Sequence, residues 1–292
     1  MDVEITKTNG DKFKLSDYGV HVTDFIVSSL PIKPLYGEIE GRHGTVDYGA
    51  TYGGQRTITV PFYIRAKDSH DFPLMRDVIF QLVNDTEPFF VRELRKLNEN
   101  NRFVGGKRYL VRLGNTFTID QSSTVIGFGE FAFETTKLPF AESIGTTQDI
   151  ERNGISSDDE IWGFGMGLIV DEEALKYTHK AEVGKTFSVY NAGNVTVHPF
   201  YCDLKMTIRN VQGSTDMFQI TNLTNGSRAR INVPVKPTDT IVYDGPNVTR
   251  NGLAFLRDTR KDFIELSPGW NNFQIYYCES ATIEFDFRFY YL

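Results

Sequence analysis

The spacing of apolar and polar residues predicts a series of short strands in the first half of the chain. Between Gln55 and Arg65, apolar residues recur at every second position, which is the period of a half-buried strand. Pro61 removes one amide donor from that segment, so we expect this residue at a sheet edge or a bulge. Further strands are predicted over Phe89–Leu94, Lys107–Leu113, Asn115–Gln121 and Thr124–Thr136.

Two local motifs accompany these strands, a helix and a hairpin. The apolar stripe of the helix recurs at helical spacing and consists of Met75, Val78, Ile79 and Leu82. Asp71 can cap this helix and Pro73 suits its first turn, so the helix is predicted from Asp71 to Asn84. At the start of the chain, residues 2–15 favour a hairpin with a two-residue turn at Asn9-Gly10.

The second half of the chain is organised differently. Lys137–Phe140 ends the first run of strands. Ala141–Glu160 lacks a period and is rich in Ser, Thr, Gly, Asp and Glu, which is typical of a connection. Short strands separated by turn residues follow, and their regular spacing favours a β-sandwich. They are predicted over Lys185–Asn191, Phe200–Asn210, Met217–Asn222, Arg228–Val233, Thr240–Tyr243 and Phe263–Leu266.

The strongest alternation in the chain lies at its C-terminus. Apolar side chains occupy every second position from Ile283 to Tyr291. We expect this strand to pair with Phe273–Tyr277 across Glu279-Ser280, forming a long hairpin with one buried aromatic face.

The composition favours a mostly β fold in two parts. With 292 residues the chain exceeds what one hydrophobic core usually holds. Its 23 Phe, 14 Tyr and 2 Trp favour sheets, where flat rings pack well. We predict an N-terminal β-domain with one helix over residues 1–140 and a C-terminal β-sandwich over residues 141–292. Residues 141–185 are expected to form an extended lead-in to the sandwich.

Charge and sorting signals narrow the class of protein. A net charge of −7 counts against a nucleic-acid binder, which normally has a basic face. The N-terminus shows no secretory signal, and the longest apolar run, Ile161–Val170, is too short to span a bilayer. Cys202 and Cys278 lie in apolar stretches and are expected to be buried free thiols. We therefore expect a chain that folds or assembles in a reducing cytoplasm.

No pattern in the sequence predicts catalysis, a metal or a cofactor. The chain lacks a Gly-X-Ser-X-Gly elbow, and its histidines are not paired with another His or Cys at ligand spacing. Asp158-Asp159-Glu160 is expected to be a solvated loop rather than a pair of glycosidase carboxylates. Residues 163–167 (Gly-Phe-Gly-Met-Gly) lack the strand and helix that flank a phosphate-binding loop, so we expect a close-packed turn there. The histidines are His21, His43, His70, His179 and His198.

Positive charge is concentrated in one segment of this acidic chain. The segment contains Arg92, Arg95, Lys96, Arg102, Lys107, Arg108 and Arg112. One interpretation is a contact with an acidic partner or with passing nucleic acid, and the other is a solvated hairpin. The sequence leaves both open.

The ordered set of these features resembles the distal tail proteins of long-tailed phages, the hub family at the tail tip. In the first half the resemblance rests on residues 40–44 (Glu-Gly-Arg-His-Gly), Asp47-Tyr48-Gly49, Arg56-Thr57-Ile58, the helix and Lys137–Phe140. In the second half it rests on residues 189–193 (Val-Tyr-Asn-Ala-Gly), residues 266–271 (Leu-Ser-Pro-Gly-Trp-Asn) and the terminal strand. The set covers nearly the whole chain.

The resemblance implies a structural virion protein without enzymatic activity or cofactor. It implies that residues 1–140 form a hexameric ring and that residues 141–292 form a galectin-like sandwich that projects outward. The ring would join the tail tube to tail-associated (lysin or fibre) and baseplate proteins at the tail tip, with assembly in the host cytoplasm. The glycines between Gly41 and Gly54 fit an extended arm that the family uses to reach a neighbouring subunit. Candidate subunit contacts are Arg42, Arg56, Arg95, Lys96 and Arg102.

The alternative function is a lectin-like tail protein that binds carbohydrate on the host cell wall. A galectin-type site surrounds a Trp with His, Asn, Arg and Glu. Trp162 is followed by Gly163-Phe164-Gly165 without the Glu, and His198-Pro199 lacks the neighbouring Asn and Arg. Trp270 follows a Pro268-Gly269 turn. On these grounds we expect no glycan binding.

Overall fold

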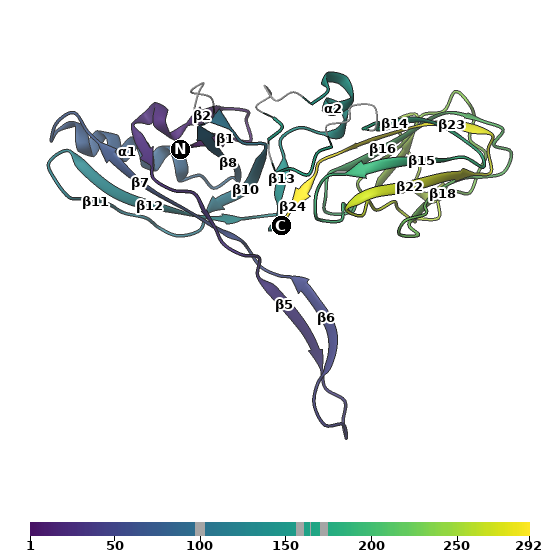
Figure 1. Cartoon of the computed structure of the whole chain (residues 1–292), viewed down its shortest axis with the longest axis horizontal. Helices are drawn as coiled ribbons and strands as arrows, with labels where there is room; N and C mark the ends of the chain where they lie inside the picture. The colour runs from purple at the N-terminus through teal and green to yellow at the C-terminus, as the bar shows by residue number, and fades with distance from the viewer. Residues whose placement is uncertain (97–102, 156–160, 164, 170–174) are drawn as a thin grey trace. The chain divides into compact units, whose positions relative to one another are not determined.

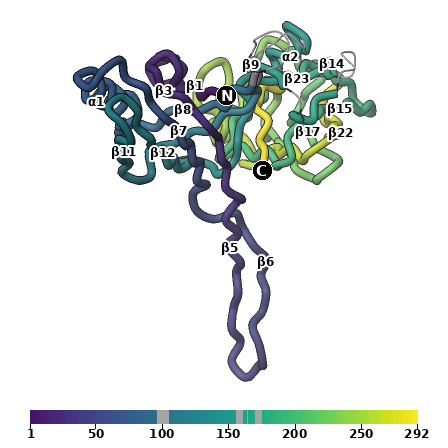
Figure 2. Tube along the Cα trace, turned by 60° about the vertical axis from the view of Figure 1, so that its left-hand side comes forward, coloured from purple at the N-terminus to yellow at the C-terminus, as the bar shows by residue number. Residues whose placement is uncertain are grey.

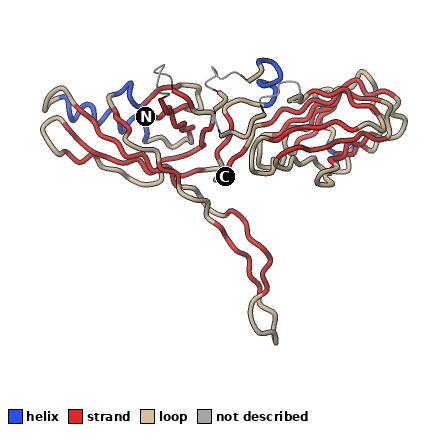
Figure 3. Tube along the Cα trace, viewed as in Figure 1, coloured by secondary structure: helices blue, strands red, loops and turns tan. Residues whose placement is uncertain are grey.

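The computed structural model describes residues 1–96, 103–155, 161–163, 165–169 and 175–292. The chain is mostly β, as the alternation predicts (Figures 1 and 3). It divides into two compact units, Met1–Ala141 together with Leu292, and Glu142–Tyr291. Each unit is described separately below.

The first unit is built on an antiparallel sheet with strands in the order β2-β1-β8-β10-β12-β7-β3. Three shorter strands, β4, β9 and β11, pair with β7, β8 and β12. The bounds are β1 Asp2–Thr6, β2 Lys12–Lys14, β3 Val20–Val22, β4 Ile26–Val27, β7 Thr57–Arg65, β8 Phe89–Lys96, β9 Phe103–Val104, β10 Lys107–Leu113, β11 Ile119–Gln121 and β12 Ile126–Thr135. The strand predicted over Asn115–Gln121 is therefore confined to its last three residues.

The predicted N-terminal hairpin is confirmed, but its turn is longer than two residues. β1 pairs with β2 up to Thr6 opposite Lys12, which leaves residues 7–11 in the loop. Lys7 N donates to Asp11 O, and Gly10 has φ = +94°, a conformation that glycine adopts without strain. The Asn9 side chain also stabilises the turn, because its Oδ1 accepts from Asp11 N.

The predicted helix is confirmed as α1, Asp71–Val83, but it is rotated relative to the expected stripe. Phe72, Ile79 and Val83 are buried, whereas Val78 is 40% exposed. Asp71 lies inside the first turn, and Asp68 instead accepts from His70 N and Asp71 N. A large Phe72 at the start of the helix explains the rotation, because its ring enters the core at the expense of Val78. A short 3₁₀ helix, η1 (Leu15–Tyr18), contributes Leu15 to the same core.

Pro61 shows how a proline is accommodated in an interior strand. β7 lies between β12 and β3, so of the two predicted positions for Pro61 the sheet edge is wrong, and Pro61 instead lies at a break in the pairing. The N–H and hydroxyl of Thr23 both donate to Pro61 O. Pro61 therefore faces the gap where β3 has ended and β4 has not begun, so its missing N–H interrupts the ladder with neither strand.

β5 (Ile32–Gly37) and β6 (Val46–Tyr52) form a separate two-stranded ribbon, which we call the arm (Figures 1 and 2). The two strands pair only with each other. Gly41, Gly44, Gly49 and Gly54 have positive φ angles between +80° and +93°. An extended arm at these glycines is thus observed, although no strand was predicted there.

The second unit is a sandwich of a six-stranded and a four-stranded antiparallel sheet, ordered β14-β23-β16-β19-β20-β21 and β15-β22-β17-β18. The Phe273 and Phe285 rings, one from each sheet, meet at 5.0 Å in the core between them. The bounds are β14 Thr178–Glu182, β15 Thr186–Asn191, β16 Leu204–Gln212, β17 Phe218–Asn222, β18 Arg228–Ile231, β19 Ile241–Asp244, β20 Asn247–Arg250, β21 Leu253–Ala254, β22 Gly269–Tyr276 and β23 Ser280–Phe287, with η2 at Leu256–Asp258.

Two strand predictions in this unit need correction. Phe263–Leu266 forms only an isolated bridge between Leu266 and Val197, and the strand expected from Phe200 begins at Leu204. Residues 198–202 turn instead, with Cys202 N donating to His198 O.

The C-terminal alternation is confirmed as far as Phe289, but Tyr290 is buried as well as Tyr291, and the predicted pairing is wrong. Ile283, Phe285 and Phe287 on β23 and Phe289 beyond it are almost completely buried. β22 and β23 belong to different sheets, so they do not form a hairpin. Their aromatic faces meet across the sandwich rather than side by side, because the connection around Glu279 passes from one sheet to the other.

Residues 141–153 form more regular structure than a connection. β13 (Ala141–Ser143) is followed by α2 (Thr147–Asn153), and Thr146 begins α2 with a capping box to Asp149. Thr147 Oγ1 and Gln148 Nε2 donate to Phe285 O. Ser143 N donates to Phe289 O, close to β24 (Tyr290–Tyr291). Buried polar bonds rather than an apolar stripe hold α2, which is why hydrophobic periodicity did not reveal it.

Candidate functional site

The arm is the most exposed apolar element of the first unit. Ile32, Tyr36 and Tyr48 are 67%, 62% and 64% exposed, and Leu35, Ile39 and Tyr52 are also exposed. An isolated two-stranded ribbon is marginally stable in water, and a cluster of exposed apolar side chains marks an interaction surface. The arm is therefore the leading candidate for a contact with another polypeptide.

Local packing explains the sequence of the arm. The Tyr48 ring lies across Gly37, where a Cβ atom would come within 2.3 Å of the ring. Gly49 N donates to Asp47 Oδ1, which stabilises a glycine at φ = +93°. At the base of the arm, the Tyr52 and Phe140 rings meet edge to face at 5.7 Å. The arm is thus a formed ribbon rather than an irregular loop.

Arg56 holds the base of the arm through hydrogen bonds to neighbouring segments. Its Nε donates to Ser28 O at 2.7 Å, and its backbone N donates to Thr135 Oγ1 at 2.9 Å. Its guanidinium lies over the Tyr109 ring, and burial raises the pKa of that tyrosine. Arg56 is only 8% exposed, and its buried Nη1 has no partner among the described residues.

The other four candidate contact residues are dispersed. Arg42 is exposed near the tip of the arm, where its N–H donates to Ile39 O. Arg95 lies on β8, where its Nε donates to Glu93 Oε1 at 2.6 Å. Lys96 ends β8, and Arg102 lies outside the described residues. The structure therefore places Arg42 and Arg56 at the tip and the base of the arm, whereas Arg95 lies on β8.

Part of the basic segment is used inside the fold. Arg92 is 4% exposed, and it donates to Gly105 O and pairs with Glu4 Oε1 at 3.3 Å. The Arg108 guanidinium lies 3.8 Å from the Phe90 ring centroid, and burial lowers the pKa of Lys107. Arg92 and Arg108 thus help to hold β8 to its neighbours.

Within the described part of the chain, no group of three or more His, Cys, Asp and Glu side chains could hold a metal ion. Both cysteines are buried thiols outside any disulfide, as predicted, and burial raises the pKa of the Cys278 thiol to about 11. Asp158-Asp159-Glu160 lies outside the described residues. Gly167 confirms the predicted close packing, since its Cβ would lie 2.5 Å from Ala192 O. No helix in the described residues is long and apolar enough to cross a membrane.

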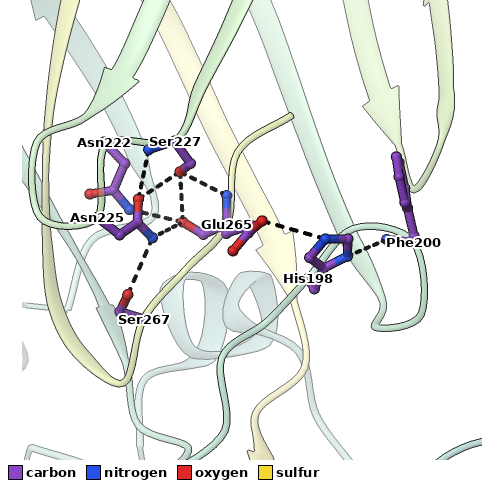
Figure 4. Close-up of polar contacts among 7 residues, drawn as sticks. All are labelled: His198, Phe200, Asn222, Asn225, Ser227, Glu265 and Ser267. Atoms are coloured by element: carbon purple, nitrogen blue, oxygen red, sulfur yellow. Dashed lines mark hydrogen bonds and ion pairs between the residues drawn. The ribbon is translucent and has the colours of Figure 1, made fainter. Parts of the chain in front are cut away.

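The second unit contains a network of polar bonds around Glu265 (Figure 4). Glu265 O accepts from Asn222 Nδ2 at 2.8 Å, from Asn225 Nδ2 at 3.0 Å and from the Ser227 hydroxyl. His198 Nε2 lies 3.4 Å from Glu265 Oε1, and His198 Nδ1 accepts from Phe200 N. These bonds fix the turn after β17 against the segment that leads into β22.

A buried asparagine extends the network to Trp270. Asn271 is 0% exposed, and its Nδ2 donates to Ser267 O and Gly269 O. Its Oδ1 accepts from Ser267 N and from Asn222 Nδ2. The turn that carries Trp270 is therefore set by the Asn271 amide. Sequence reasoning missed this role, because the sequence does not indicate whether an asparagine next to a Pro-Gly turn has a buried side chain.

We expect Asn271→Ala to lower the free energy of unfolding by about 1–3 kcal/mol, because it leaves buried polar groups without partners. The neighbouring Asn272→Ala is the matched control, since Asn272 is exposed, and it should change stability by less than about 0.5 kcal/mol. Urea unfolding followed by circular dichroism measures both. Equal midpoints for the two variants would show that the Asn271 amide does not hold this turn.

Comparison with known proteins identifies the first unit. Residues 9–135 match the family model of the phage tail protein RIFT-related domain. The first unit is a phage tail protein domain. Searching curated proteins gave no match.

The fold extends the likeness to the whole chain. The crystal structure of the SPP1 Dit protein (gp 19.1), described as a paradigm of the hub adsorption apparatus in phages that infect Gram-positive bacteria, superposes with a TM-score of 0.63. The two chains are 12% identical, and the match covers 98% of this chain and 99% of SPP1 Dit. Phage p2 baseplate structures with Sr and with Ca also match, at 10% and 11% identity and a TM-score of 0.36, over 98% and 99% of this chain and 97% of theirs. The resemblance to phage distal tail proteins is confirmed, as a family domain in residues 9–135 and as a fold over the chain.

Proposed function

We propose that this phage tail protein is a structural hub subunit that assembles into a hexameric ring at the distal end of the tail. The single observation that carries the proposal is the arm, a formed ribbon whose apolar side chains face solvent in one chain. The phage tail domain and the Dit-like fold support the same role. In a ring with cyclic symmetry each subunit presents two different, complementary surfaces, and an arm that enters a neighbouring copy is one way to supply them.

The partners follow from the position of a hub in the tail. One face of the ring would contact the tail tube protein, and the other would contact tail-associated and baseplate proteins. Residues 1–140 would form the ring, and residues 141–292 would project from it as a galectin-like sandwich. In this proposal the protein assembles in the host cytoplasm and is then located at the tail tip of the virion. We propose no enzymatic activity.

Size measurement tests this proposal directly. Light scattering of the purified protein should give a particle of about 200 kDa, six times the 33.3 kDa chain. Negative-stain microscopy should show rings with a central opening. A population that remains at 33.3 kDa at micromolar concentration would contradict the hub.

A further inference from the structure

The four-stranded sheet of the second unit has one face in the core and one face toward solvent. Along β22, Asn271, Phe273 and Ile275 are buried, while the residues between them point outward. The strand register extends this outward face over β15, β17 and β18. Its residues are Thr186, Ser188, Tyr190, Gln219, Thr221, Arg228, Arg230, Trp270, Asn272, Gln274 and Tyr276. We call this surface the outer face.

Aromatic rings lie at both ends of the outer face. Trp270 is 40% exposed, and it lies opposite Tyr190 in the register with 4.9 Å between ring centroids. The Tyr190 hydroxyl donates to Gly167 O at 3.0 Å, which fixes its ring beside the indole. Tyr276 lies at the other end of β22, about 20 Å from Trp270 at the usual rise of a strand. The face is therefore long enough for a chain of several sugar rings.

Two side-chain amides between these rings are held by their oxygen atoms. Ser188 Oγ donates to Asn272 Oδ1 at 2.7 Å, and the Tyr276 hydroxyl donates to Gln274 Oε1 at 2.8 Å. In the described chain, neither the Asn272 Nδ2 nor the Gln274 Nε2 group has a hydrogen-bond partner. Each amide therefore presents two oriented N–H donors to solvent. A ligand that accepts from these donors breaks no hydrogen bond within the protein.

The charge on the outer face is low. The face carries no carboxylate, and the guanidinium of Arg228 is paired with Asp262 at 3.0 Å. At the far end of the row, the buried Nε of Arg230 has no partner among the described residues. The surface thus offers flat apolar rings and oriented neutral donors, without the negative charge that would attract a basic partner.

We propose that the outer face binds a saccharide chain, with Trp270 as the stacking platform. A sugar ring presents an apolar C–H face, which packs on an aromatic ring, and a rim of hydroxyl oxygens, which accept from amide N–H groups. The outer face supplies both in one row along β22. Asn271 acts as a positioning residue, because its buried amide sets the turn that carries Trp270.

This site differs from the one sought in the sequence. The sequence search asked for His, Asn, Arg and Glu close to a Trp along the chain, and on that basis predicted no glycan binding. The proposed site instead uses Trp270, Asn272 and Gln274 in one row along β22, with Tyr190 and Ser188 opposite them on β15. His198 and Glu265 contact each other outside these strands and have no part in the proposal.

Isothermal titration of the full-length protein tests the proposal. The probes are soluble oligosaccharides built from glucose, N-acetylglucosamine, galactose, mannose or rhamnose units. We expect at least one of them to bind with a dissociation constant of about 1 mM or tighter. Trp270→Ala should weaken that binding at least about tenfold, and Asn272→Ala by several-fold. Tyr277→Ala is the matched control, because Tyr277 is an exposed aromatic residue outside the face, and it should bind as the wild type does.

A second measurement reports from the site itself. The chain has only two tryptophans, and Trp162 is buried against Phe289. In a Trp162→Phe background, the fluorescence of Trp270 should shift on addition of the bound oligosaccharide. The proposal is overturned if no probe binds at millimolar concentration, or if Trp270→Ala binds as tightly as the wild type. Light scattering measures ring assembly independently of both results. Failure of the saccharide proposal therefore does not contradict the proposed ring, and failure of the ring does not contradict the saccharide proposal.

Discussion

Replacing Phe285 by aspartate is expected to unfold the sandwich of the second unit. Phe285 is 0% exposed, and its ring lies 5.0 Å from that of Phe273 in the opposite sheet. Losing a buried Phe ring costs about 3–5 kcal/mol, and burying a carboxylate adds several kcal/mol more. The sum is comparable to the total stability of a domain, which is about 5–15 kcal/mol. Circular dichroism at 25 °C should therefore show loss of native signal or a strongly lowered urea midpoint.

Phe200→Asp is the matched control for this change. Phe200 belongs to the same unit but is 55% exposed, so the same substitution buries no charge there. Its effect should stay below about 1 kcal/mol. If Phe285→Asp were as stable as Phe200→Asp, the two sheets would not be joined through the Phe273–Phe285 contact.

The prediction of strands from alternation succeeded because burial on one face imposes a period of two on the sequence. β7 and β23 follow that pattern closely. Alternation contains no information on which strand lies beside which, and so Phe273 and Phe285 were placed in one hairpin instead of on facing sheets. The same limit explains Pro61, whose tolerance depends on a gap between two other strands.

Functional surfaces were harder to predict than the core. The arm has no buried face, so its strands show no alternation of apolar and polar residues. Only its glycines indicated an extended segment. Arg56 was proposed as a subunit contact, yet its bonds to Ser28 and Thr135 lie inside the chain. The orientation of the Asn272 amide depends on Ser188 on the neighbouring strand, and a linear sequence does not specify such a partner.

Replacing Ile32 and Tyr36 by serine is expected to convert the proposed ring into single chains. Both side chains are more than 60% exposed on β5, and neither contributes to the core of its own unit. Burial of such a side chain in an interface is worth about 1.5–3 kcal/mol. The double variant should therefore weaken each subunit contact about a hundredfold or more, since every 1.4 kcal/mol is a factor of ten. Light scattering at micromolar concentration should then show 33.3 kDa particles in place of the ring.

The control for the arm variant is Leu253→Ser, which removes a more exposed apolar side chain from the second unit. Leu253 is 76% exposed on β21, and its loss should leave the particle mass unchanged. Both variants should keep wild-type urea midpoints, because neither touches a buried residue. A ring that survives loss of Ile32 and Tyr36 would show that the subunits associate through another surface. A ring lost in both variants would assign the contact to apolar surface in general rather than to the arm.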